Sequence, residues 1–361
     1  MSADRAIELQ DLSWTLQAEG RLDEAFRACA EALQLMEESE GPGSPDVANL
    51  LTDLAEIEHE RGNLSAALGL AERAVAIEDA LNEVFTGETA RRMRSRTLGL
   101  LGTIRRSQGD YLRAEGPLLD ALSMAVAECG ERSEEAARAQ NDLAMLYKYW
   151  GRFDEGLRLY ERALASVIAI LGEESLSCAG IYHNLGGILH ARGDFAAAEK
   201  PGRKAWEISR RLLGEDDPRT MRDAVAYAAI LDGLQRYDES ERIYRTALSI
   251  YEKALGADHE DVATTLHNLA AVLAARGDDA GAEQHYRRAL TMKEKLFGVD
   301  HPDVALTCNN LGRLLNDCGR ADEAVALLER AVAVLERRLM PGHPHLAVAR
   351  DNLRKSADAR L

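Results

Sequence analysis

Residues 259–298 read HEDVATTLHNLAAVLAARGDDAGAEQHYRRALTMKEKLFG, and the same order of residue types begins again 42 residues later, at His301. In both copies a Leu followed by a small residue precedes a Gly, and two Ala positions follow that Gly. Large apolar and small residues recur at helical spacing on either side of the Gly. The stretch therefore predicts two helices joined by a turn at Gly277.

The turn at the centre of this stretch recurs along the whole chain of 361 residues. Successive turns are 42 residues apart, except that the second and third are 47 apart. A fixed period of this length is the sequence signature of a repeat architecture. We therefore expect eight repeats, with a longer loop around Asn82–Gly87. The turns begin at Gly20, Gly62, Gly109, Gly151, Gly193, Gln235, Gly277 and Gly319.

Start and stop signals divide each repeat into a first helix of about 17 residues and a second of about 20. Eighteen positions before the turn is a residue that can cap a helix N-terminus, and Pro follows it in four cases. A Gly suited to a helix C-cap usually ends the second helix. Pro117 and Pro201 lie inside second helices, where we expect a kink without a break. The predicted caps are Ser2, Ser44, Ser133, Ser175, Asp217, His259, His301 and His343, and Arg91 breaks the pattern.

These residues resemble the tetratricopeptide repeat (TPR). The 42-residue period, with linkers such as LGADHEDVA (255–263) and FGVDHPDVA (297–305), resembles the kinesin-light-chain-like subclass. The resemblance implies an all-α fold, a right-handed superhelical α-solenoid of about eight helix pairs. Residues 1–342 would form the eight TPR repeats. Residues 343–361 would form a C-terminal capping helix, since a terminal repeat needs a polar outer face.

Charge and composition exclude several classes of function. Lys and Arg number 44 against 61 Asp and Glu, a net charge of −17, which argues against nucleic-acid binding. No secretory signal and no long charge-free apolar run is evident, so we expect a cytoplasmic protein with no membrane partner. The five cysteines form no C-x-x-C pair, and we interpret them as buried small side chains in a reducing compartment.

No pattern of catalytic residues is found in the sequence. Phosphate-binding glycine loops, zinc-protease motifs and serine-nucleophile motifs are all missing, so we expect no enzyme and no cofactor. His343-Pro-His345 could suggest a metal, but the capping positions already account for His259, His301 and His343. We therefore expect no metal site.

A second face of the first helices is free to vary, and the TPR resemblance implies that it lines an inner groove where family members hold extended peptides. In repeats one and two this face carries Asp11, Asp53, Glu56 and Glu60, for a net charge of −4. In repeats three to six five cations face two carboxylates, for a net charge of +3. We therefore expect the groove to receive an acidic or carboxylate-bearing segment. The residues of this middle stretch are Arg96, Arg106, Arg138, Lys148 and Arg222 with Asp142 and Asp232, together with His183 and His190.

Side-chain amides mark the same face. An amide offers donors and an acceptor, so it can pair with the backbone of an extended ligand of any sequence. The resemblance implies that such amides, with a basic residue four positions earlier, clamp a peptide backbone or a terminal carboxylate. The match is partial, because Leu100 and Ala226 replace the amide near Arg96 and Arg222. The predicted peptide-binding set is completed by Asn141, Asn184, Asn268, Asn309, Asn310 and Arg313.

Three functions are compatible with these observations. The first is an adaptor or scaffold whose groove holds an extended, partly acidic segment of a protein partner. The second is a structural or regulatory subunit that assembles with itself or with an enzyme through its outer side or its ends. The third is a receptor that changes shape around a peptide signal. The same Asn and Arg side chains could instead bond within the protein as a solvated network.

Overall fold

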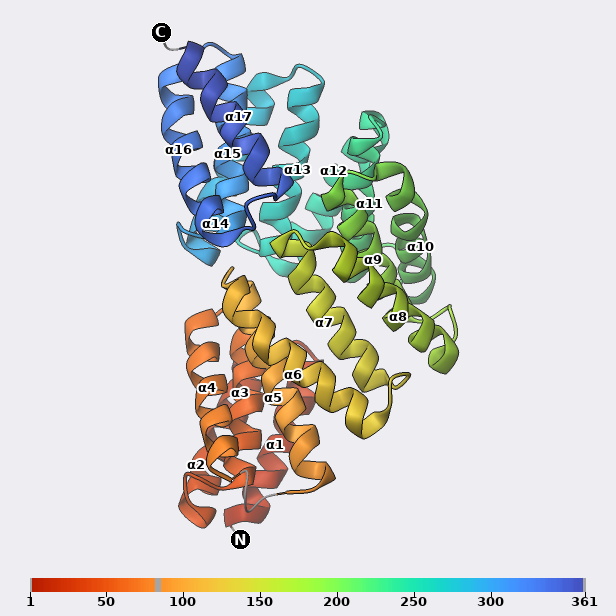
Figure 1. Ribbon diagram of the computed structural model, residues 1–361, viewed down its shortest axis with the longest axis vertical. Coiled ribbons are helices and arrows are strands. Elements are labelled where there is room, and N and C mark those ends of the chain that lie inside the picture. Colours follow the sequence, from red (N-terminus) through yellow and green to blue (C-terminus); the bar gives the residue numbers. More distant parts are fainter. Residues whose placement is uncertain (1, 82–85, 360–361) are drawn as a thin grey trace. The chain divides into compact units, whose positions relative to one another are not determined.

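The computed structural model describes residues 2–81 and 86–359, and every regular element among them is an α-helix. First and second helices alternate along the chain as predicted, and α17 follows the eighth pair (Figure 1). The chain forms two compact units, Met1–Leu146 (unit 1) and Tyr147–Leu361 (unit 2). The helices are α1 (Ser2–Ala18), α2 (Leu22–Glu40), α3 (Pro45–Glu60), α4 (Leu64–Leu81), α5 (Glu88–Ser107), α6 (Tyr111–Cys129), α7 (Glu134–Trp150), α8 (Phe153–Leu171), α9 (Leu176–Arg192), α10 (Phe195–Leu213), α11 (Pro218–Gly233), α12 (Tyr237–Leu255), α13 (Glu260–Ala275), α14 (Asp279–Phe297), α15 (Pro302–Asp317), α16 (Ala321–Arg338) and α17 (Pro344–Ala359).

The helix starts are fixed by the predicted capping side chains. Ser2 is instead the first residue of α1 itself. Each of the other predicted caps accepts a hydrogen bond from a backbone N–H two or three residues later, which satisfies a donor that the helix leaves unpaired. Ser44 accepts from Val47 N at 3.2 Å, and His301 accepts from Asp303 N at 3.1 Å. The same bond is made by Ser133, Ser175, Asp217, His259 and His343.

Part of the extra length of the second repeat extends the helix that follows it. Helix α5 begins at Glu88, after Gly87 at φ +109°, and its 20 residues make it longer than the other first helices. The remainder of the predicted longer loop falls on residues 82–85, which lie outside the described part of the chain.

The turn and stop positions adopt the left-handed backbone that favours glycine. Both the turn Gly277 and the stop Gly298 have positive φ, at +84° and +82°. In the sixth repeat Gln235 takes the place of the turn glycine and keeps φ at +61°. Among the described residues it is the one non-glycine with positive φ, so the repeat geometry overrides the preference of the local residue.

The core forms where a large residue of one helix lies against a small residue of the next. A Cβ added at Gly102 would lie 2.5 Å from Leu118 Cγ, and one at Gly312 would lie 2.7 Å from Leu328 Cγ. The neighbouring leucines, Leu101 and Leu311, are buried. Leu12 holds the same position in the first pair but is 47% exposed, because no described helix precedes α1.

Helix α6 continues through Pro117 because another group satisfies the carbonyl that the proline leaves unpaired. Proline has no N–H, so the carbonyl four residues earlier, at Arg113, loses its usual helical donor. Arg105 Nη1 of α5 donates to Arg113 O at 3.0 Å. Helix α10 likewise continues through Pro201.

The cysteine interpretation is correct for three residues and wrong for the others. Cys29, Cys178 and Cys308 are buried, whereas Cys129 is half-buried and Cys318 is exposed. Cys318 caps the C-terminus of α15, where the chain turns at the surface, so its position in the repeat gives it no core contact. Within residues 2–81 and 86–359, no helix combines the length and the apolar character that crossing a bilayer requires.

Candidate functional site

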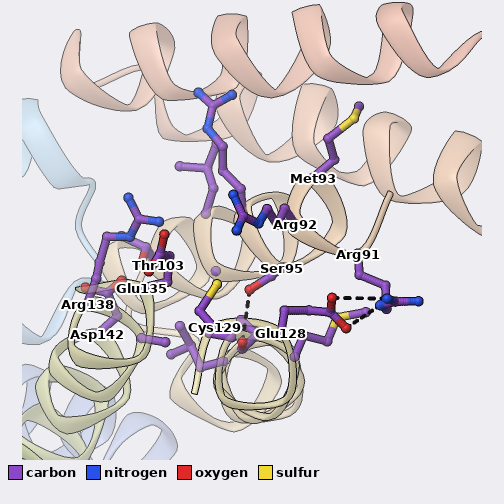
Figure 2. A pocket seen from close by; sticks show the side chains of 18 of the residues that line it. Arg91, Arg92, Met93, Ser95, Thr103, Glu128, Cys129, Glu135, Arg138 and Asp142 are labelled. Carbon is purple, nitrogen blue, oxygen red and sulfur yellow. Dashed lines mark hydrogen bonds and ion pairs between the residues drawn. The ribbon is translucent and has the colours of Figure 1, made fainter. Parts of the chain in front are cut away.

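A cavity of about 510 Å³ opens in unit 1 between helices α3, α5, α6 and the first half of α7 (Figure 2). We call it the unit 1 pocket. Its wall combines arginines and carboxylates with an apolar part formed by Met93, Leu100, Leu118 and Met124. Two of its arginines, Arg96 and Arg138, belong to the peptide-binding set predicted from the sequence.

Arg96 is held by carboxylates of α3. Its Nη2 lies 2.7 Å from Asp53 Oδ1 and 2.6 Å from Glu56 Oε2. Asp53 is almost fully buried and also accepts from Gln10 Nε2 at 2.6 Å and from Trp14 Nε1 at 3.2 Å. The positive charge of Arg96 is therefore balanced inside the protein, which leaves this end of the pocket without the net basic charge that the sequence predicted.

The opposite end of the pocket, on α7, contains Arg138 and Asp142. Arg138 is exposed and forms no ion pair with a described residue, and Figure 2 shows its guanidinium pointing toward Thr103. Burial raises the pKa of Asp142 above its ordinary value, while Arg106, the amide of Asn141 and Arg138 act in the other direction. Asn141 Nδ2 donates to Asp142 Oδ1 at 3.3 Å.

The remaining arginines of the pocket are paired. Arg91 and Glu128 form an ion pair between α5 and α6, visible at one side of Figure 2. Arg92 pairs with Glu88 one turn earlier on α5, at 2.8 Å. Arg138 is thus the arginine of this wall that has no carboxylate within ion-pair distance among the described residues.

In unit 2 the predicted amides bond to the protein itself. Asn352 of α17 donates to Asn309 at 2.9 Å, and Asn309 donates to Asn310 at 3.0 Å. Asn310 Nδ2 lies 3.2 Å from His267 Nε2, and His267 Nδ1 lies 3.0 Å from Thr307 Oγ1. The amides thus form a relay between first helices.

Most other predicted residues of unit 2 also contact neighbouring repeats. His183 Nδ1 lies 2.8 Å from Asp223 Oδ1, and Arg222 Nη2 lies 2.9 Å from Asp261 Oδ2. Arg313 pairs with Asp317 one turn later, at 3.2 Å.

Lys148, Asn184 and Asn268 complete the predicted set. Lys148 extends over α9, with its Nζ 2.7 Å from where a Cβ on Gly187 would be. Asn184 is half-buried and has a partner within the protein. Asn268 is half-buried and makes no side-chain hydrogen bond to a described residue, so its amide is open to a ligand.

A group of histidines in unit 2 was not predicted to come together. Burial and the charge of His345, at the start of α17, lower the pKa of both His190 of α9 and His267 of α13. His343, predicted only as a cap, contacts the turn between α7 and α8. No sequence pattern indicates this contact, because the two segments are far apart along the chain. In the described part of the chain, no cluster of three or more His, Cys, Asp and Glu side chains is arranged to hold a metal ion.

Comparison with known sequences gives one family. A model described as "Tetratricopeptide repeat" matches residues 8–79, 93–169, 135–211, 223–295 and 280–337. A clustered mitochondria protein homolog of Aedes aegypti is 26% identical over 202 residues, covering 56% of this chain and 14% of that protein. Protein KINESIN LIGHT CHAIN-RELATED 1 of Arabidopsis thaliana is 25% identical over 234 residues, covering 63% of this chain and 37% of that protein. The chain therefore spans well under half the length of these relatives.

Solved structures give the same fold. BtubC (BKLC) from P. vanneervenii is 27% identical with a TM-score of 0.50, and the match covers 65% of this chain and 92% of that one. A Rap protein in complex with Competence and Sporulation Factor has a TM-score of 0.64 at 14% identity, and the match covers 99% of this chain and 98% of that one. The quorum sensor NprR from B. thuringiensis has a TM-score of 0.63 at 12% identity, and the match covers 91% of this chain and 87% of that one. The last two likenesses concern the fold alone.

Proposed function

Because this chain belongs to the tetratricopeptide repeat family, in its kinesin-light-chain-like subclass, we propose that it is a non-enzymatic scaffold that binds an extended, partly acidic segment of another protein. Stacked helix pairs present a continuous surface to a partner, and the architecture itself supplies no reactive group. We assign the chain to the cytoplasm, as its unpaired cysteines favour.

Arg138 is the observation that carries this proposal. It is exposed on the wall of the unit 1 pocket and has no carboxylate within ion-pair distance among the described residues. A guanidinium group binds a carboxylate through two parallel hydrogen bonds, which favours a Glu or Asp side chain or a chain terminus as its partner. The other arginines of the pocket already hold carboxylates, so we expect a partner with few acidic residues.

The rest of the pocket supports an extended segment with an apolar side chain. Met93 and Met124 are adaptable side chains that suit a binding surface, and they line the same cavity as Leu100 and Leu118. A segment with an acidic residue at Arg138 and an apolar residue at the methionines would match both parts of the wall. We include Asn268 as a second contact point in unit 2.

The proposal is tested with a short fluorescein-labelled peptide rich in Glu and Leu, and with its counterpart that has Gln at every Glu. Binding to the Glu peptide should weaken with added salt, because exposed charges are screened. Arg138→Glu should weaken it about tenfold or more, since it replaces attraction by repulsion. Arg113→Glu changes the charge equally at an exposed site outside the pocket and is the matched control.

The outcomes separate the candidate functions. If both peptides bind equally, or if the two variants behave alike, the unit 1 pocket is not an acidic-segment site. If a native partner captured by the wild-type chain is still bound by Arg138→Glu, assembly through the outer side or the ends is favoured instead.

A receptor is the second candidate. Proteins of similar fold include the Rap protein in complex with Competence and Sporulation Factor and the quorum sensor NprR. In unit 2 the start of α17 contacts the α7–α8 turn, a long-range contact that a ligand could break or tighten. A change in the radius of gyration on adding the Glu peptide would favour this candidate, and an unchanged radius would favour the scaffold.

A further inference from the structure

The segment His343–His345, just before and at the start of α17, is packed more tightly than a helix cap requires. His343 is 3% exposed, and its Nδ1 accepts from His345 N at 3.1 Å, which caps α17. The equivalent caps in earlier repeats, His259 and His301, accept the same kind of hydrogen bond from the backbone N–H groups of Asp261 and Asp303. His301 also stacks on the neighbouring Phe297, whereas His343 contacts a part of the chain that is distant in sequence.

These further contacts join the end of the chain to the fourth helix pair. The His343 ring lies on the backbone of Gly151, with its Cδ2 2.6 Å from where a Cβ on that glycine would be. The same ring meets Phe153 edge-on, with centroids 5.7 Å apart. Figure 1 shows the start of α17 close to the end of α7. Residues that are nearly 200 positions apart in the sequence are therefore in direct contact within unit 2.

The chemistry of this contact differs from that of the other histidine caps. After His259 and His301 the second residue is an aspartate, Asp261 or Asp303, whose carboxylate lies within 4 Å of the imidazole. At the last cap the second residue is His345, whose ring stacks on His343 with centroids 5.0 Å apart. An imidazolium at His343 would therefore meet another imidazole in place of a carboxylate.

We propose that His343–His345 is a pH-sensitive clasp, which holds α17 on the α7–α8 turn at neutral pH and releases it when its imidazoles become protonated. The charge of His345 acts on both His190 of α9 and His267 of α13, so the clasp lies near two residues of the first helices. The inference concerns unit 2 alone and does not depend on the function proposed for the unit 1 pocket.

The groups around the clasp favour neutral imidazoles. Burial, reinforced by His345, lowers the pKa of His343 to about 4. Burial, with Lys148 and His345, lowers the pKa of His190 to about 4. Burial also lowers the pKa of His345, against the attraction of Asp303.

The pKa of His267 is lowered by burial and by the charges of Lys293 and His345. Two further charged groups lie on neighbouring elements and are themselves compensated or engaged by other charges. Glu260 attracts Lys293, and Arg152, beside Gly151, is neutralised by Glu155 at less than 3 Å.

The direction of the pH effect follows from these shifts. A released histidine takes up its proton near pH 6.5, whereas His343 in the clasp does so near pH 4, and the pKa of the clasped His345 is shifted in the same direction. The clasp is therefore fully favoured above about pH 6.5 and weakens as the pH falls toward about 4. Each such histidine contributes up to about a tenfold loss of closure per pH unit in that window.

The experiment measures the distance between α8 and α17 directly. Spin labels are placed on Glu161→Cys and Val348→Cys, two exposed positions, in the full chain with Cys129→Ser and Cys318→Ser. Double electron–electron resonance is recorded at about pH 7.5 and about pH 5, on either side of the point where a released histidine titrates. We expect one narrow distribution at neutral pH and a longer, broader one at acid pH, with full reversal on return.

Two glycine variants provide a matched pair. Gly151 and Gly193 occupy equivalent turns with φ of +93° and +90°, so alanine strains both backbones equally. Only at Gly151 would the new methyl group meet His343, because nothing lies within 4 Å at Gly193. Gly151→Ala should lengthen the distance at neutral pH, and Gly193→Ala should leave it unchanged.

A third variant separates protonation from folding. His343→Asn keeps a side chain that caps α17 but removes the titrating ring. It should keep the short distance at neutral pH and reduce its increase at acid pH. The clasp is disproved if the wild-type distribution is the same at both pH values, or if the two glycine variants give the same distances.

Discussion

Arg96 of α5 and Asp53 of α3 form an ion pair of 2.7 Å in which the carboxylate is almost fully buried. The arginine was expected to face a ligand, and in the structure it balances a charge that the fold has taken out of water. A buried carboxylate is costly unless it is paired and hydrogen-bonded. The pair therefore contributes to the stability of unit 1 before it contributes to binding.

Arg96→Gln should destabilise unit 1 by about 1–3 kcal/mol, because Asp53 would lose its cation while staying buried. The value is set below that of a fully buried pair because Arg96 is partly exposed. The midpoint of urea unfolding measures the loss. Arg92→Gln removes an exposed ion pair between residues one helical turn apart. It should change the free energy of unfolding by less than about 0.5 kcal/mol. Equal effects of the two substitutions would mean that the Arg96–Asp53 pair has no structural role.

Gln235→Gly should stabilise the sixth repeat by about 0.5–1 kcal/mol. Gln235 holds φ at +61°, where a side chain is strained and glycine is not. The reverse change at an equivalent turn, Gly277→Gln, should destabilise the seventh repeat, since Gly277 has φ at +84° and open space around it. Thermal unfolding of both variants shows whether each is more or less stable than the wild type. A loss of stability in Gln235→Gly would contradict the strain argument.

Asp232→Asn should stabilise unit 2 at about pH 7.5 by about 1–2 kcal/mol and lose this advantage toward pH 4. Burial raises the pKa of Asp232 to about 6, although Tyr244 donates to it at 2.6 Å. Above that pH the native carboxylate is charged and poorly solvated. As the pH falls from about 6 toward 3.8, the ordinary pKa of an unfolded aspartate, Asp232 is protonated in the native state before it is protonated in the unfolded state. The wild type therefore regains stability over this range.

Urea midpoints at the two pH values check this prediction. Asp317→Asn, at an exposed carboxylate paired with Arg313, serves as the control and should show a small effect. An Asp232→Asn gain that is the same at both pH values would exclude titration of Asp232 as its cause.

Arg105→Met should cost about 0.5–1.5 kcal/mol in the wild type and much less in a Pro117→Ala background. In the wild type Arg105 is the donor to the Arg113 carbonyl that Pro117 leaves unpaired. Alanine at position 117 restores the helical donor, so the arginine becomes dispensable. The contact of Arg105 with Glu72 is present in both backgrounds and cancels in a double-mutant cycle. A coupling energy near zero would show that Arg105 does not compensate for the proline.

The helices could be predicted from the sequence because their determinants are local. Ser44, Asp217 and His301 cap helices through bonds to N–H groups two or three residues away, and Gly277 allows a turn by its own φ. The repeat also fixed which residues are small, since Gly312 must admit Leu328. Such contacts recur in every copy, so one period specifies all of them.

The candidate site could be predicted only as a face of the first helices. Whether Arg96 or Arg138 is available depends on which carboxylates the neighbouring repeat brings near, and this varies from copy to copy. A partial signal exists, because Arg96 and Glu56 are 40 residues apart and Arg222 and Asp261 are 39 apart, close to the repeat period. Searching for opposite charges at that separation would have found several of these pairs.

The sequence by itself determined the repeat, the helix limits, the caps and the turns. Each of these depends on short-range hydrogen bonds and on a pattern that is repeated eight times along the chain. The tertiary structure alone decided that His343 lies on Gly151. This contact joins a cap position and a turn position of repeats that are far apart along the chain. It arises from the summed geometry of all the repeats between them, to which every helix contributes a small rotation that no single stretch of sequence specifies.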